Sequence, residues 1–121
     1  MTTLYQITNL IASDGAFSAD ITFNPAHPVF AGHFPGKPIV PGVVLVEISA
    51  AIVSRVMGKE MVIKETSVIK FLQLIEPSLH PVVIAKGTII EETQHRLSVG
   101  LIFISGDVIF AKLRGIRMVI E

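Results

Sequence analysis

A histidine, a glutamate and a glycine stand out as groups that could move protons next to a carbonyl. His33 lies in a stretch rich in proline and glycine, and because an imidazole titrates near neutrality it suits a general base. Glu47 is the only ionisable residue between Lys37 and Arg55 and suits a general acid. Gly42 opens an apolar segment, and a bare backbone amide at a helix start can polarise a carbonyl oxygen. Together they match proton abstraction beside a carbonyl with loss of a β-leaving group.

Each of these residues also has a structural interpretation. A lone loop histidine is more often structural than catalytic. A carboxylate in an apolar helix is costly unless it is paired, hydrogen-bonded or protonated, which favours a functional role for Glu47. An ion pair with Arg55 or Lys70 would explain the same residue. Gly42 would also simply open a helix after Pro41.

The element that must position these groups is a helix over Gly42–Met57. Pro41 suits the start of its first turn, and Gly58 stands where a helix-ending glycine belongs. Its apolar residues are distributed nearly all the way around the helix axis, which predicts a buried helix. Residues 24–42 before it hold five prolines and three glycines, which predicts a long, stiff and extended loop.

The other segments are predicted to be strands. Residues 4–12 and 17–23 flank the turn signal Ser13-Asp14-Gly15 and predict a hairpin. After the helix, four strand-like runs follow, over residues 61–74, 81–92, 96–104 and 107–120. Two strands, a buried helix and four strands predict an α+β fold with one antiparallel sheet curled around the helix.

Composition excludes several classes of protein. The 121 residues suit a single domain over residues 1–121, and the absence of cysteine excludes disulfides and thiolate metal sites. Ten basic residues balance ten acidic ones, so we expect no nucleic-acid partner. The most apolar window, residues 38–54, contains Glu47 and a Pro-Gly break, so we expect no membrane span. With no signal peptide evident, we expect a soluble, cytoplasmic protein. Only 17% of the residues are charged, which predicts that part of the surface is buried in an oligomer.

Residues 24–54, and the stretch from Gly32 through Pro41-Gly42-Val43 to Glu47 most closely, resemble the β-hydroxyacyl-acyl-carrier-protein dehydratases of fatty-acid synthesis. That resemblance implies a hot-dog fold, in which one long helix is wrapped by an antiparallel sheet, and a dimer. It implies that His33 removes the α-proton of a 3-hydroxyacyl thioester, that Glu47 protonates the leaving hydroxyl and that the Gly42 amide holds the thioester oxygen.

The resemblance also implies further site residues and partners. The substrate-binding residues would be Phe34, Pro41, Val43 and Phe71. The substrate would be carried on acyl carrier protein or coenzyme A, in fatty-acid or polyketide-like chain elongation, and no cofactor or metal is implied. The partner would be a second copy of the chain or a related subunit.

Two departures and two alternatives accompany this resemblance. Ala51 stands where the family usually has a glutamine, and the chain starts at the family's first strand. We interpret the second departure as a sign of a specialised pathway or of a subunit that pairs with a different one.

The alternative functions are a non-catalytic acyl-binding subunit and a thioesterase on the same fold, although the joint presence of His33 and Glu47 favours the dehydratase. The cations Lys37, Arg55, Lys59 and Lys64 form either a solvated edge or a docking site for an acidic carrier protein.

Overall fold

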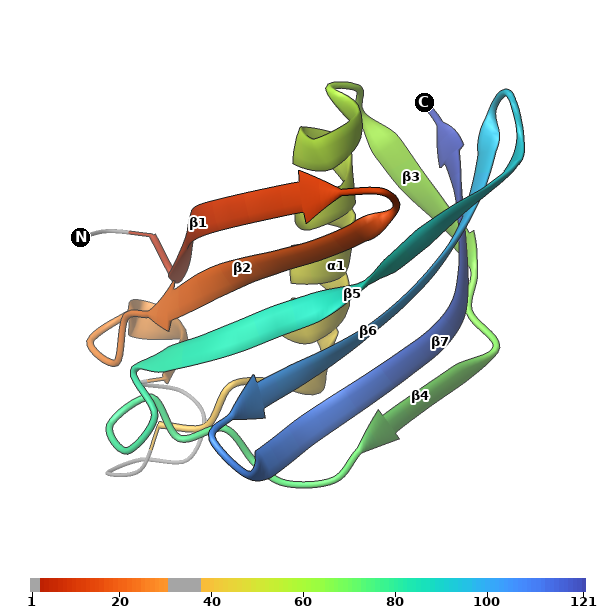
Figure 1. Ribbon diagram of the computed structural model, residues 1–121. Helices are drawn as coiled ribbons and strands as arrows, with labels where there is room; N and C mark the ends of the chain where they lie inside the picture. The colour runs from red at the N-terminus through yellow and green to blue at the C-terminus, as the bar shows by residue number, and fades with distance from the viewer. Residues whose placement is uncertain (1–2, 31–37) are drawn as a thin grey trace.

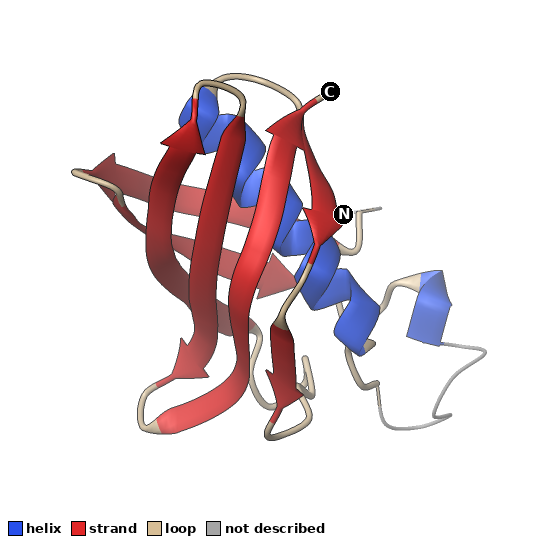
Figure 2. Ribbon diagram, turned by 90° about the vertical axis from the view of Figure 1, so that its right-hand side faces the viewer, coloured by secondary structure: helices blue, strands red, loops and turns tan. Residues whose placement is uncertain are grey.

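The computed structural model describes residues 3–30 and 38–121, in which one α-helix lies against one face of a curved antiparallel sheet (Figure 1, Figure 2). The helix α1 spans Gly42–Met57, and a short 3-10 helix, η1, spans Pro28–Phe30. The strands are β1 (Tyr5–Ser13), β2 (Ala16–Phe23), β3 (Met61–Glu65), β4 (Val68–Phe71), β5 (Val82–Thr93), β6 (Arg96–Ser105) and β7 (Val108–Ile120). The predicted α+β fold is confirmed.

The strands of the described residues form one sheet in the order β1-β2-β5-β6-β7-β3, and every pairing is antiparallel. Strand β4 also pairs with β7, so β3 and β4 follow one another along the same side of that strand (Figure 1). Short β4 has only β7 as its pairing partner among the described strands. The chain around β4 therefore forms an edge of the sheet.

Local turn chemistry explains the first hairpin. Asp14 and Gly15 both have positive φ values, of 51° and 80°, between β1 and β2. Two central residues with positive φ are typical of a type I′ turn, whose twist matches that of the flanking strands. The predicted hairpin is confirmed.

The segment over residues 61–74 differs from the prediction of one strand, because the structure divides it into β3 and β4. The division lies beside Gly115 of β7, which has a φ of 62°. The side chain of Ser67 lies against this glycine, and the Ser67 amide donates a hydrogen bond of 3.2 Å to the Gly115 carbonyl. Strand β3 pairs with residues 117–120 of β7 and β4 pairs with residues 111–114, so Gly115 lies between the two pairings. The helix is therefore followed by five strands rather than four.

The limits of α1 agree with the prediction. Pro41 is the N-cap residue, with extended backbone angles, and the first intrahelical bond runs from the Val44 amide to the Pro41 carbonyl at 3.0 Å. Gly58 ends the helix in the left-handed conformation, with a φ of 67°, and its amide donates to the Ser54 carbonyl. Proline and glycine thus determine both ends of the helix through backbone geometry alone.

The sequence predicted that the curled sheet buries most sides of α1, and in the single chain one side of the helix remains uncovered. Its buried residues, Val44, Leu45, Ile48, Ser49, Ile52 and Val53, lie on the side toward the sheet. Val43 is 73% exposed, and Glu47 is also exposed. One sheet curls far enough to cover only part of a helix, so apolar residues remain uncovered on the other side.

The loop before the helix is only partly described. Residues 24–30 form a turn and η1 rather than the predicted extended segment, and Phe30 is buried in the core. The His27 Nδ1 atom accepts a hydrogen bond of 3.0 Å from the Val29 amide, which stabilises this short turn. No helix within the described residues is long and apolar enough to cross a membrane.

Close contact between β5 and β6 depends on Gly87. A Cβ atom at this position would overlap the Gly100 carbonyl oxygen and come within 2.7 Å of the Leu101 Cα, both on β6. The main chains can approach this closely only because Gly87 has no side chain.

We expect Gly87→Ala to lower the free energy of unfolding by about 1–3 kcal/mol, because the added methyl overpacks against a backbone that cannot move aside easily. Gly100→Ala is the matched control, since its Cβ would meet only the Leu113 carbonyl, at an ordinary 3.7 Å. Urea unfolding followed by circular dichroism measures both. Equal losses in the two variants would contradict this account of the β5–β6 contact.

Candidate active site

The start of α1 presents backbone amides beside an aromatic ring. The amides of Gly42 and Val43 precede the first intrahelical bond, so they have no partner within the helix. The ring of Phe71, from the end of β4, lies directly on Gly42, and a Cβ there would come 2.7 Å from the Phe71 Cζ. Phe71 is 55% exposed, so one face of its ring is open to a ligand. The structure therefore places Phe71 against Gly42 at the start of α1.

A residue that is distant in the sequence holds the Glu47 side chain in place. The Tyr5 hydroxyl, on β1, donates a hydrogen bond of 3.1 Å to Glu47 Oε1. This bond leaves Oε2 of the same carboxyl group available to a substrate or to a partner chain. The alternative ion pairs with Arg55 or Lys70 are absent among the described residues.

Arg55 instead fixes the same strand to the helix. Its Nη1 atom donates a hydrogen bond of 3.2 Å to the Ile7 carbonyl, two residues along β1 from Tyr5. Two polar contacts, Tyr5 with Glu47 and Arg55 with Ile7, thus join β1 to the outer side of α1. The position of the Glu47 carboxyl group therefore depends on the docking of β1.

The environment of Tyr5 keeps its hydroxyl a hydrogen-bond donor. Burial, the hydrogen bond to Glu47 and the negative charge of Glu47 together raise the pKa of Tyr5 from 10.0 to about 12, while Arg55 acts in the opposite direction. Burial is the largest cause, because it disfavours the phenolate. Tyr5 thus stays protonated at any physiological pH.

Helix geometry separates the predicted acid from the predicted amide donor. The Gly42 amide points along the helix axis, out of the N-terminus, whereas the Glu47 side chain projects from the side of the helix more than one turn further on. Val43, four residues before Glu47, lies on the face of Glu47, and both are exposed. The Gly42 amide and the Glu47 carboxyl group therefore face different directions.

Two of the predicted site residues, His33 and Phe34, lie outside the described residues. The candidate residues identified from the sequence did not include Tyr5. The available signal was weak, namely one tyrosine at the start of the first strand. Among residues 3–30 and 38–121, no three His, Asp or Glu side chains gather closely enough to hold a metal ion.

One helix wrapped by a curved antiparallel sheet defines a hot-dog protein. A structure described as the dehydratase heterocomplex ApeI:P from Xenorhabdus doucetiae is similar, with a TM-score of 0.72, 16% identity and coverage of 97% of this chain and 99% of that chain. A mutant thioesterase from Pseudomonas aeruginosa has a TM-score of 0.61 and 13% identity, over 96% of this chain and 80% of its own. These likenesses show the fold, which hosts more than one chemistry.

The sequence comparisons are more specific. Residues 9–99 match the ApeI-like family, described as ApeI dehydratase, and the chain belongs to this family. It is also 38% identical over 65 residues to a protein named 3-hydroxyacyl-acyl-carrier-protein dehydratase FabZ from Wolbachia pipientis. That alignment covers 48% of this chain and 44% of the relative, so the chain matches less than half of the relative's length.

The hydrogen bond between Tyr5 and Glu47 can be tested by titration. The chain has one tyrosine and no tryptophan, so phenolate absorbance reports Tyr5 alone. We expect a midpoint near pH 12 in the wild type and a lower one in Glu47→Gln, which removes the negative charge that opposes the phenolate. Since folding favours the neutral phenol, stability should fall as the pH rises from 10.0 toward 12.

Glu60→Gln is the control for this titration, because it removes a carboxylate beyond the other end of α1 and should leave the midpoint unchanged. Denatured protein gives the reference midpoint near 10.0. Identical midpoints in the wild type and in Glu47→Gln would show that the two side chains are not in contact in solution.

Proposed function

We propose that this protein removes water from a 3-hydroxyacyl thioester, carried on acyl carrier protein or coenzyme A, to form the trans-2-enoyl thioester. Membership of a dehydratase family and the partial match to a named 3-hydroxyacyl dehydratase support the reaction class. The observation that carries the proposal is Glu47, a carboxyl group oriented by Tyr5 on the uncovered side of α1. A group held in one geometry and open to a substrate is what general acid catalysis requires.

The proposed reaction needs two proton transfers. His33 takes the proton from the carbon next to the thioester carbonyl, and the electron pair forms the new double bond. The β-hydroxyl leaves as water after it receives a proton from Glu47. Because Tyr5 donates to Oε1, Oε2 is the oxygen that faces the β-hydroxyl in this proposal.

The Gly42 amide has the third role in the proposal. Negative charge grows on the thioester oxygen as the α-proton leaves, and an amide at a helix N-terminus stabilises such charge. The ring of Phe71 borders this position and offers an apolar surface for the acyl chain, together with Pro41 and Val43. Phe34 joins them in the proposed substrate site by the resemblance alone.

A second chain completes the site in this proposal. Within one chain Glu47 and Gly42 face different directions, and Val43 beside Glu47 is an exposed apolar residue. A two-fold partner seated on this face would bring the histidine and amide of one subunit to the acid of the other. The partner is a second copy or a related subunit; the similar structure from Xenorhabdus doucetiae is described as a heterocomplex.

We expect His33→Ala and Glu47→Gln each to lower kcat by about 10²–10⁴-fold, since each removes one proton-transfer group. Mass spectrometry of enoyl thioester formation, on a panel of 3-hydroxyacyl chains on both carriers, measures the rates. Circular dichroism verifies that the variants are folded. A variant that keeps most of its rate on a good substrate would remove that residue from the mechanism.

The shared site can be tested by mixing His33→Ala with Glu47→Ala after subunit exchange. Each mixed homodimer then has one site with both native groups and one with neither. Since random exchange makes half of the dimers mixed, about a quarter of the wild-type activity should return. If native mass spectrometry shows mixed dimers and the activity stays absent, each site is built from one chain or requires a different subunit.

A further inference from the structure

Strand β1 has an irregularity at Asn9. In the pairing of β1 with β2, Thr8 lies opposite Asp20. The next paired residue of β1 is Ile11, which lies opposite Ser18, so β1 uses two residues where β2 uses one. This count defines a β-bulge, in which one strand of an antiparallel pair contains an extra residue. Asn9 lies within the bulge, and its φ of 51° is in the left-handed region.

The residue type and the side chain of Asn9 both stabilise this conformation. Asparagine adopts the left-handed conformation more often than most residues, because its short polar side chain can form local hydrogen bonds. Asn9 Nδ2 donates a hydrogen bond of 2.8 Å to Oδ2 of Asp20 on the neighbouring strand. A β-branched residue at position 9 would be strained in this conformation. Asn9 therefore fixes the bulge through its backbone and through its contact with β2.

The bulge decides which side chains of β1 face α1. The turn between β1 and β2 fixes the register of the last three residues of β1. If pairing continued from there without an extra residue, Gln6 would lie opposite Phe23, and Thr8 would lie opposite Ile21. Phe23 and Ile21 are buried on the inner face of the sheet. Because directly opposite residues share a face, Gln6 and Thr8 would then face the helix.

With the bulge, the first half of β1 presents its other face to the helix. Tyr5 lies opposite Phe23, and Ile7 is buried in the core. The Tyr5 hydroxyl reaches Glu47 Oε1 at 3.1 Å, while Gln6 is exposed. A shift of one residue moves every side chain of a strand to the opposite face. The extra residue at Asn9 therefore turns the phenol, rather than the Gln6 amide, toward the carboxyl group of Glu47.

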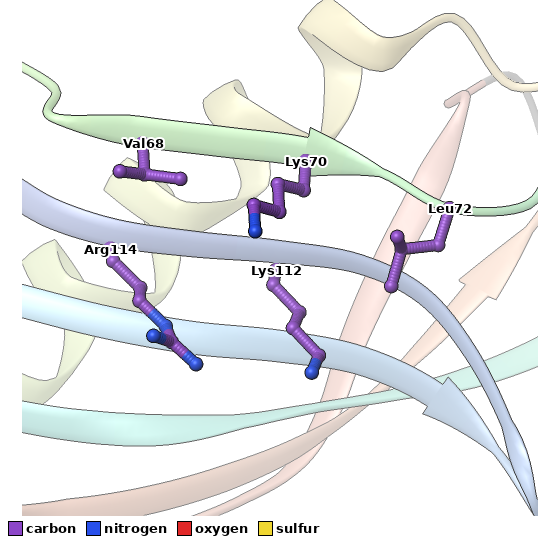
Figure 3. Close-up of a pocket in the computed structure, with 5 residues that line it drawn as sticks. All are labelled: Val68, Lys70, Leu72, Lys112 and Arg114. Carbon is purple, nitrogen blue, oxygen red and sulfur yellow. The ribbon is translucent and has the colours of Figure 1, made fainter.

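The opposite edge of the sheet shows plain alternation, because the pairing of β4 with β7 has no register shift. Figure 3 shows the side chains of this region that lie on the outer face of the sheet, away from α1: Val68, Lys70, Leu72, Lys112 and Arg114. Phe71 points the other way, onto Gly42. Alternation alone thus brings Phe71 to the helix, whereas β1 needs an extra residue to bring Tyr5 to Glu47.

We propose that Asn9 is a positioning residue of the proposed active site, because its bulge turns Tyr5 toward Glu47 and so sets the orientation of the acid. This inference rests on the proposed function. Asn9 contacts Asp20 on the outer face of the sheet, so it acts on Glu47 through Tyr5. Bulges are frequent next to active sites, where they change the direction of a side chain. Residues held in sparsely populated backbone conformations also cluster at such sites.

Two substitutions at Asn9 separate its backbone conformation from its hydrogen bond. Asn9→Val disfavours the left-handed conformation, whereas Asn9→Gly adopts it freely, and both remove the hydrogen bond to Asp20. Titration of the single tyrosine reports on Tyr5 without turnover, and circular dichroism at each pH verifies folding. We expect Asn9→Val to move the midpoint from about 12 toward 10.0 and Asn9→Gly to keep it. Thr8→Val, an exposed and paired neighbour, is the control and should keep the wild-type midpoint.

Turnover measures the consequence for catalysis. Asn9→Val should lower kcat on a 3-hydroxyacyl thioester by at least about tenfold with little change in KM, because a misplaced acid slows the reaction. Asn9→Gly should restore most of the rate. In a Tyr5→Phe background, Asn9→Val should change kcat by less than about twofold, because two residues that act through one another have non-additive effects.

The outcomes distinguish this proposal from the proposed function. If the wild type dehydrates no thioester, the function is wrong, and the titration still decides whether the bulge orients Tyr5. If folded Asn9→Val keeps the wild-type midpoint or kcat, if Asn9→Gly loses as much as Asn9→Val, or if the effects of Asn9→Val and Tyr5→Phe add, the positioning proposal is wrong and the function stands. Should Asn9→Val not fold, Asn9→Ala, which is less strained in this conformation, replaces it with the same expectations.

Discussion

The burial of α1 against the inner face of the sheet is the constraint on which the rest of the structure depends. Ile48, Ile52 and Val53 are completely buried there, in one core with Phe103 and Phe110. A sheet must curve to enclose a helix, and Figure 1 shows the strands curving around α1. Burial of apolar surface is the largest favourable contribution to folding, so the strands adapt to the helix.

The same constraint divides the functional groups between two sides of the helix. The covered side is used for stability, so chemistry is left to the N-terminus and to the uncovered side. Gly42 meets Phe71 at the N-terminus, and Glu47 meets Tyr5 on the uncovered side. Because the fold also occurs in a thioesterase, the fold alone does not determine the reaction.

The outer face of the sheet shows that a net charge of zero can conceal strong local charge. Arg96 and Arg117 are neutralised by Glu65 and Glu92, while the cations around Lys112 are not. Both clusters arise from strand register, which brings together residues far apart in the chain. Hydropathy and composition record neither of them, because they sum charges along the sequence and not across a sheet.

The sequence by itself determined the features that depend on local backbone chemistry. Pro41 and Gly58 limited α1, Asp14 and Gly15 set the first turn, and the spacing from His33 to Glu47 indicated the dehydratase family. Only the tertiary structure decided that a continuous apolar run divides into β3 and β4, and that Glu47 is exposed and bound by Tyr5, 42 residues away. The reason is physical: a turn or a helix end depends on the conformations open to a few adjacent residues, whereas strand breaks and side-chain partners depend on how distant segments pack.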